Sequence, residues 1–164
     1  MKVNHKYPEA GLTLVEVMIS VVLLAAFFAS IFEVNAVCLR YIDATKESVA
    51  ALQLVHDRVE TLRNVAYSDL TSSSYVQGLV ATAANTSDFC SKATEIIKIR
   101  AYPTANGVTQ FTRSPGAAVT VDSTATSRGS TLVQIDVSTT WNLTLGGRGR
   151  SEQTSTIISN GSKK

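Results

Sequence analysis

Residues 12–32 read LTLVEVMISVVLLAAFFASIF and carry a single charged side chain, Glu16. As a helix, this stretch of 21 residues would be about 31 Å long, close to the hydrocarbon thickness of a bilayer. Thirteen of its residues are Leu, Ile, Val or Phe, which together favour insertion by roughly 4–8 kcal/mol. One carboxylate inside the membrane costs about 3 kcal/mol. The stretch therefore predicts a transmembrane helix despite Glu16.

An ionisable group inside a membrane span is by default a candidate functional residue, which applies to Glu16. The alternative is that Glu16 reaches the membrane interface or is protonated, and a functional role requires a cationic partner within the membrane. The preceding residues 1–11 are short and polar, contain Lys2 and Lys6, and end in Gly11. A cut after Gly11 would make Leu12 the new N-terminus, with an amine of pKa near 8 that is largely charged at neutral pH. This amine cannot easily reach Glu16 of its own helix, one turn away, but it can meet Glu16 of a neighbouring molecule. Such pairing would neutralise both charges only on assembly.

Gly11 and the residues LTLVEVM at 12–18 resemble the class III signal of type IV prepilins and pseudopilins. The resemblance implies that a prepilin peptidase cuts between Gly11 and Leu12 and methylates the new amine, and that Glu16 pairs with a neighbouring N-terminus. It also implies an apolar helix that first anchors the chain and later forms the filament core. Two positions differ from the usual pattern: Leu12 replaces Phe, and Glu33 replaces a helix-bending Pro. Residues 51–63 are more loosely similar to minor pilins of the pilus-modification type.

Two other interpretations of the N-terminus stay open. Residues 34–36 (VNA) resemble the cleavage site of a conventional secretory signal, which would release a soluble domain. Against it, residues 12–32 are longer than a normal signal core and contain Glu16. An uncut chain would instead be a single-span membrane anchor carrying an extracytoplasmic binding domain.

The helical pattern continues beyond the span, since neither Pro nor Gly occurs between Leu12 and Ala66. We expect one helix over residues 12–66, with a transmembrane part at 12–32 and an amphipathic stalk at 44–66. Apolar residues at steps of three and four predict the face that packs on a head domain: Val49, Leu52, Val55, Val59, Leu62 and Ala66. The predicted polar face comprises Lys46, Glu47, Gln53, Asp57, Arg58, Glu60 and Arg63.

Residues 67–164 are expected to form a β-rich globular head. Residues 67–93 are interpreted as a long loop, followed by strands near 97–101, 108–112 and 118–122. The strongest strand signal is the alternation over residues 132–145, with Val133, Ile135, Val137 and Trp141 on one face. Glycines at 146–149 predict a hairpin turn to a returning strand at 150–159. The predicted fold is α+β, a long N-terminal helix packed against a small antiparallel sheet.

The rest of the sequence favours no catalytic or cofactor chemistry. Nucleophile motifs and phosphate-binding loops are missing, so we predict neither an enzyme nor a cofactor. His56 and Glu60 share a helix face but offer two metal ligands at best, and we expect both to lie on a solvated polar face. Cys38 and Cys90 have no metal-ligand spacing, and a disulfide between them is left open.

The charge is small, with a net value of +2. Arg128, Arg148 and Arg150 sit near predicted turns without interleaved aromatic residues, so nucleic-acid binding is not expected. The lysines ahead of the span favour a cytoplasmic N-terminus, although Arg40 and Lys46 beyond it weaken this bias. The resemblance to prepilins implies that the membrane is a bacterial inner membrane and that the head lies in the periplasm. The resemblance implies three partners, namely a prepilin peptidase, other pilin or pseudopilin subunits and an inner-membrane assembly platform.

Overall fold

The structure is a computed structural model that describes residues 13–126, 131–143 and 146–161. It divides into two compact units, Met1–Tyr41 and Ile42–Lys164. The long helix α1 (Leu14–Asn64) contributes its first part to one unit and the part from Ile42 onward to the other, which we call the head unit. The prediction of a helix over residues 12–66 is confirmed to within two residues at each described end.

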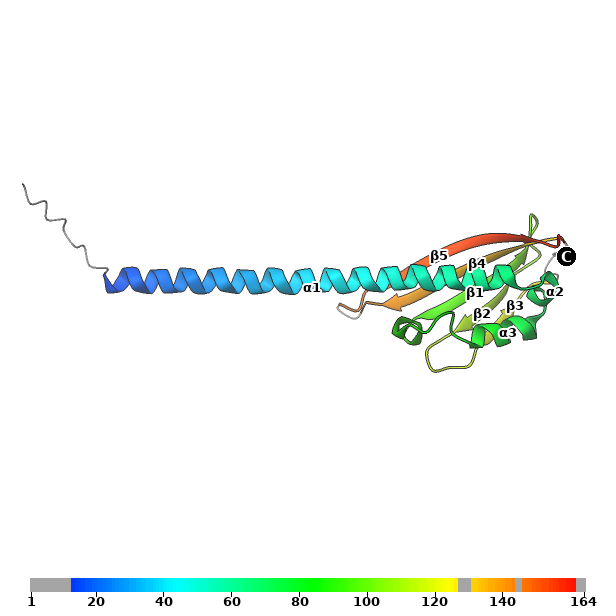
Figure 1. Cartoon of the computed structure of the whole chain (residues 1–164), viewed down its shortest axis with the longest axis horizontal. Coiled ribbons are helices and arrows are strands. Elements are labelled where there is room, and N and C mark those ends of the chain that lie inside the picture. The colour runs from blue at the N-terminus through cyan, green and yellow to red at the C-terminus, as the bar shows by residue number, and fades with distance from the viewer. Residues whose placement is uncertain (1–12, 127–130, 144–145, 162–164) are drawn as a thin grey trace, which may run out of the picture. The chain divides into compact units, whose positions relative to one another are not determined.

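The head unit contains a five-stranded antiparallel sheet (Figure 1). Its strands are β1 (Thr94–Ala101), β2 (Thr109–Arg113), β3 (Thr120–Ser123), β4 (Leu132–Asn142) and β5 (Gly149–Ser159). They lie in the order β3-β2-β1-β4-β5, with β4 and β5 paired over their whole length from Leu132↔Ser159 to Asn142↔Gly149. The α+β fold and all five predicted strands are therefore confirmed.

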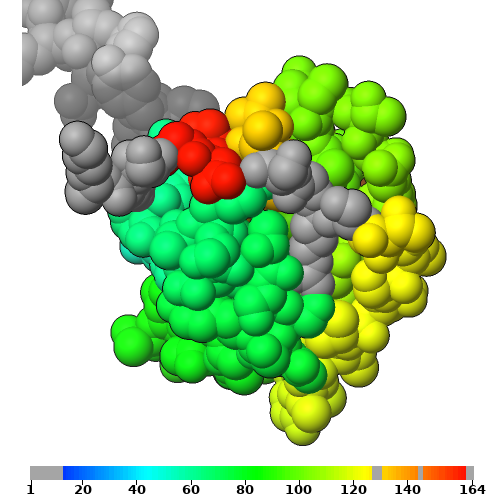
Figure 2. Space-filling view, turned by 90° about the vertical axis from the view of Figure 1, so that its right-hand side faces the viewer, coloured from blue at the N-terminus to red at the C-terminus, as the bar shows by residue number. Residues whose placement is uncertain are grey.

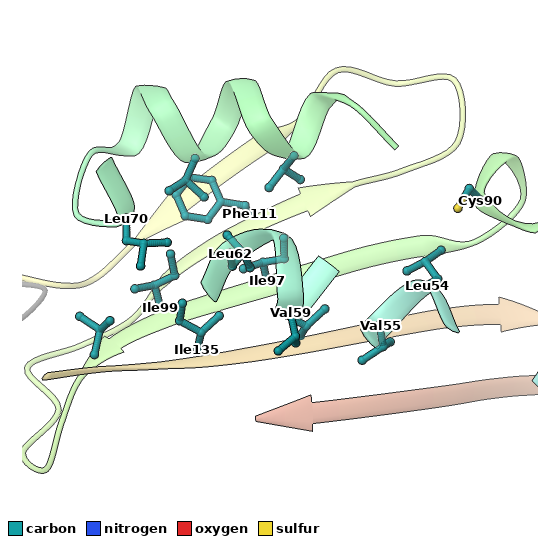
Figure 3. Packing of buried hydrophobic residues seen from close by; sticks show 14 residues of the cluster. Leu54, Val55, Val59, Leu62, Leu70, Cys90, Ile97, Ile99, Phe111 and Ile135 are labelled. Carbon is teal, nitrogen blue, oxygen red and sulfur yellow. The ribbon is translucent and has the colours of Figure 1, made fainter. Parts of the chain in front are cut away.

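One face of the sheet packs against helices. Val133, Ile135 and Val137 of β4 are buried, as their alternation predicts, together with Ile97 and Ile99 of β1. Figure 3 shows these strands contributing to one apolar cluster with Leu54, Val55, Val59 and Leu62 of α1. The other side of β4 carries polar residues such as Gln134 and Asp136, which are only partly buried.

The prediction of a loop over residues 67–93 is wrong. This segment contains α2 (Tyr67–Leu70), α3 (Ser73–Ala81) and the 3-10 helix η1 (Asp88–Ser91). Val76 and Val80 of α3 lie four residues apart, so they share one face and enter the same core as Phe111 of β2. The high Ser, Thr and Ala content hid this short amphipathic pattern.

α3 is tied to the segment that leads into β3. Gln77 Nε2 donates to the Val119 carbonyl oxygen at 3.1 Å. Figure 2 shows the green surface of the α2–α3 region beside the yellow surface of the chain around β3. The helices α1, α2 and α3 thus all contribute to the core on the same side of the sheet.

The buried face of the stalk is rotated from the predicted one. Val55, Val59 and Leu62 are buried as expected, but Val49, Leu52 and Ala66 are exposed. Ala51, Leu54 and Arg58 take their place against the sheet. The prediction that Arg58 belongs to the polar face is therefore wrong, because its charge is neutralised inside the head.

Candidate functional site

The first turn of α1 is capped by the residue that precedes it. Thr13 Oγ1 accepts a hydrogen bond from the Glu16 backbone N–H at 3.3 Å, and the Thr13 carbonyl accepts one from the Val17 N–H at 3.2 Å. A threonine that accepts from the third residue of a helix satisfies one of its free N–H groups. The sequence Thr13-Leu14-Val15-Glu16 thus sets where the apolar helix begins.

Glu16 lies in this first turn with an exposed side chain. A carboxylate near a helix N-terminus is favoured by the helix dipole. The next cationic residue along the chain is Arg40, 24 positions later and about 36 Å away along a helix. Among the described residues, the Glu16 carboxylate has no ion-pair partner, so the helix itself does not neutralise it. Gly11 and Leu12, the predicted processing residues, lie outside the described residues.

The polar side chains within the apolar part of α1 are satisfied locally. Ser20 Oγ donates to the Glu16 carbonyl at 2.8 Å, and Ser30 Oγ donates to the Ala26 carbonyl at 2.9 Å. Bonding to the carbonyl four residues earlier lets a serine enter hydrocarbon without an unpaired hydroxyl. The remaining polar side chain of α1 between Leu14 and Phe32 is that of Glu16.

Between Leu14 and Phe32, the surface of α1 is apolar apart from Glu16, Ser20 and Ser30. Its best window of 18 residues has a mean hydropathy of 2.5, and none of that window is buried. The helix is long and apolar enough to cross a membrane. Exposed side chains such as Leu14 (79%) and Val22 (67%) form an apolar surface whose contact with water is unfavourable. Such a surface is typical of a segment that lipid or neighbouring protein covers.

The other candidate residues identified in the sequence lie apart from this segment. Glu60 accepts a hydrogen bond from Arg63 at 3.0 Å and Asp57 accepts one from Asn85 at 2.8 Å. Among the described residues, His56 belongs to no group of three or more His, Cys, Asp or Glu that could hold a metal ion. Cys38 and Cys90 are both free thiols, the first exposed and the second buried. Arg148 and Arg150 are exposed, and Arg128 lies outside the described residues.

The sequence analysis missed a buried charge cluster in the head unit. Glu95 of β1 is fully buried and receives two hydrogen bonds from Arg58 of α1, from Nε at 2.6 Å and from Nη2 at 3.0 Å. Arg113 of β2 donates from Nε to the same carboxylate at 3.1 Å. Both guanidinium groups also donate to main-chain carbonyls, those of Leu79 and Thr82 for Arg58 and that of Cys90 for Arg113.

This cluster fixes how α1 lies on the sheet. Bidentate pairing sets the position of a guanidinium against a carboxylate more strictly than apolar contact does. Two signals in the sequence point to it. Glu95 has the same parity as the buried Ile97 and Ile99, and Arg58 lies four residues after the buried Leu54. A charged residue in each buried stripe predicts a paired, buried contact.

Known proteins resemble the chain at its N-terminus. Residues 7–32 match the family model described as the prokaryotic N-terminal methylation motif. The matched residues include Gly11, Leu12 and Glu16 and most of the apolar part of α1. No curated protein and no solved structure matches the chain. The match shows that residues 7–32 carry a class III signal of the kind found in type IV pilins and pseudopilins, on a helix whose apolar side chains are exposed.

Proposed function

We propose that the chain is a structural subunit, a minor pilin or pseudopilin without enzymatic activity. A prepilin peptidase cuts it between Gly11 and Leu12, and it is then assembled into a type IV pilus-like filament or a type II secretion pseudopilus, or primes one. The observation that carries the proposal is Glu16, an exposed carboxylate in the first turn of an apolar helix that offers it no cation.

The cost of an unpaired charge supports a partner from outside the helix. A carboxylate in hydrocarbon costs about 3 kcal/mol on insertion scales. The amine released at Leu12 would carry a positive charge at the positive end of the helix dipole, where its own helix disfavours it. Glu16 of a neighbouring subunit relieves both charges at once, because each subunit supplies one unpaired cation and one unpaired anion.

The apolar surface of α1 supports the same sequence of events. In the precursor, lipid covers residues 12–32 and leaves the head in water. In the filament, the helices of other subunits replace the lipid. The chain is held in the bacterial inner membrane with its N-terminus in the cytoplasm and its head in the periplasm. Its partners are then the peptidase, other pilin-like subunits and the membrane platform that assembles them.

Two other fates for the N-terminus make different products. A permanent single-span anchor would retain Met1 and present the head as a binding domain. A conventional secretory signal would be removed near Ala36 and would release the head as a soluble protein. Neither gives Glu16 a cationic partner, which is why we favour the assembly role.

Substitution of Glu16 tests the charge pairing. We expect Glu16→Ala to insert into the membrane at the wild-type level, because it removes only an unfavourable charge, and to be strongly depleted from filaments. The readout is the amount of variant in the membrane fraction and in sheared filaments, measured by immunoblotting. Glu33→Ala is the matched control, since Glu33 is an exposed carboxylate on the same helix. Wild-type recruitment of Glu16→Ala into filaments would refute the pairing.

A further inference from the structure

The part of α1 in the head unit has a second apolar face. Ile42, Val49 and Leu52 are 49%, 58% and 55% exposed. Val49 and Leu52 are three residues apart and share a side of the helix. Ala51 and Leu54, each two residues further on, are buried against the sheet on another side. We call Ile42, Val49 and Leu52, with Thr45 between them, the outer stripe.

The outer stripe continues a seven-residue pattern in the sequence. Positions alternate in steps of three and four, as in the core of a coiled coil: Phe28, Ile31, Asn35, Cys38, Ile42, Thr45, Val49 and Leu52. None of these residues is charged. Glu33, Arg40 and Glu47 instead recur seven residues apart, at the position that lies opposite the core positions in a heptad. In the sequence, the charges are thus kept off the core positions of the heptad pattern.

Lipid does not account for the outer stripe. Leu52 lies 20 residues after Phe32, about 30 Å further along a helix, which is the thickness of the hydrocarbon layer itself. Asp43 and Lys46 lie between the stripe residues in the sequence, with their charged groups paired at 4.0 Å and well exposed to solvent. The stripe therefore suits a protein partner in water, and its spacing suits another helix.

A second copy of the chain has the complementary surface. We propose that the outer stripe pairs two copies of the chain, parallel and in register, while both are anchored in the membrane. This inference rests on the membrane anchoring in the proposed function and not on processing at Gly11. Copies inserted in one membrane have the same orientation, and confinement to a plane raises their effective concentration.

Register follows from the polar residues in the pattern. In a parallel pair, Ile42, Val49 and Leu52 each meet their own counterpart, so apolar groups cover one another and no charges are brought together. Asn35 would face Asn35 of the second copy, and an Asn at one core position favours a single register because any shift buries it against an apolar residue. Such a dimer is in register, whereas the pairing of Glu16 with an N-terminal amine requires subunits shifted along the axis.

Thiol cross-linking of the full-length chain in native membranes tests the dimer. Val49→Cys is made together with Cys38→Ser, so that the new thiol is the exposed one, since Cys90 is buried. A short bifunctional maleimide should then give a product of twice the mass of the uncross-linked chain, which is 17.5 kDa before any processing. The matched control is Asp43→Cys with Cys38→Ser, because position 43 is exposed but lies off the stripe. We expect several-fold less product from this control.

A second variant separates pairing from folding. Leu52→Lys, added to the Val49→Cys chain, should abolish the cross-link and leave thermal unfolding unchanged, because Leu52 is more than half exposed. Equal products from positions 49 and 43 would overturn the proposal, as would an adduct with the mass of another protein. Cross-links from position 49 to a position one or more turns away would also overturn it, by showing a staggered arrangement. A chain that starts at Leu12 and enters filaments without any such cross-link would overturn the dimer alone.

Discussion

The two parts of α1 differ in what covers their apolar side chains. Between Leu14 and Tyr41 every residue is exposed, and the helix is mainly apolar through Phe32. In the head unit, Leu54, Arg58 and Leu62 are buried by the chain's own sheet. One part depends on lipid or other subunits for its cover, and the other brings its own. The comparison teaches that the proposed assembly role depends on the first part of α1, whereas the folding energy of the head comes from the second.

The largest expected effect is on the buried charge cluster. Glu95→Gln removes the negative charge that two buried guanidinium groups share, and we expect a loss of about 3–5 kcal/mol in the free energy of unfolding. Denaturant unfolding of the full chain in detergent measures it. Glu60→Gln is the control, because it weakens the ion pair between Glu60 and Arg63, and both of these side chains are about half exposed. It should lower the free energy of unfolding by about 0.2–1 kcal/mol. Equal losses would contradict a structural role for the cluster.

Two leucines on one helix give the next largest difference. Leu54→Ala should destabilise the head by about 2–5 kcal/mol, since Leu54 is fully buried and its loss leaves a cavity. Leu52→Ala, at an exposed position two residues earlier, should stay within about 0.5 kcal/mol of wild type. Denaturant unfolding of the full chain in detergent measures both changes. A large effect at Leu52 would mean that the head unit packs on the wrong face of the stalk.

A smaller effect is expected at the helix start. Thr13→Ala removes the side-chain acceptor for the Glu16 N–H and should weaken the first turn by about 1 kcal/mol. Hydrogen exchange at the Glu16 amide is the measurement, and Thr13→Ser should restore protection. An unchanged exchange rate in Thr13→Ala would show that Thr13 does not cap the helix.

The smallest effect concerns alkaline pH. Burial raises the pKa of Tyr67 above its ordinary value of 10.0. Because the folded state holds this proton more tightly than the unfolded state, its contribution to stability is complete below pH 10 and is lost as the pH rises through the folded pKa. The melting temperature of the wild type should fall relative to that of Tyr67→Phe as the pH rises above 10. Parallel curves would show that Tyr67 titrates normally.

The sequence predicted what depends on a long, regular pattern. The apolar run at residues 12–32, in which Glu16 stands out, and the alternation of Val133, Ile135 and Val137 are such patterns. Tertiary packing does not change the structure that they predict. The strands were placed to within a few residues for the same reason. The processing residues Gly11 and Leu12 and the role of Glu16 stay predictions that the motif match supports.

Errors arose where tertiary contacts outweigh local pattern. Val49 and Leu52 are apolar, and their spacing predicts that they are buried. The sheet instead packs on a neighbouring side of the helix, where Arg58 pairs with Glu95. A sequence pattern cannot rank two apolar faces of one helix without knowing which face the charge cluster fixes. The helices α2 and α3 were missed because each is too short for its periodicity to stand out from the surrounding Ser and Thr.

The central claim is that a new N-terminus is created next to Glu16. Mass spectrometry of the mature N-terminus, on protein from its native membrane, measures this directly. The account predicts a chain that begins at Leu12 with a methylated amine. A chain that retains Met1 would leave Glu16 without the amine it is proposed to meet, and a chain that begins near Val37 would lack Glu16 altogether. Either result would contradict the account.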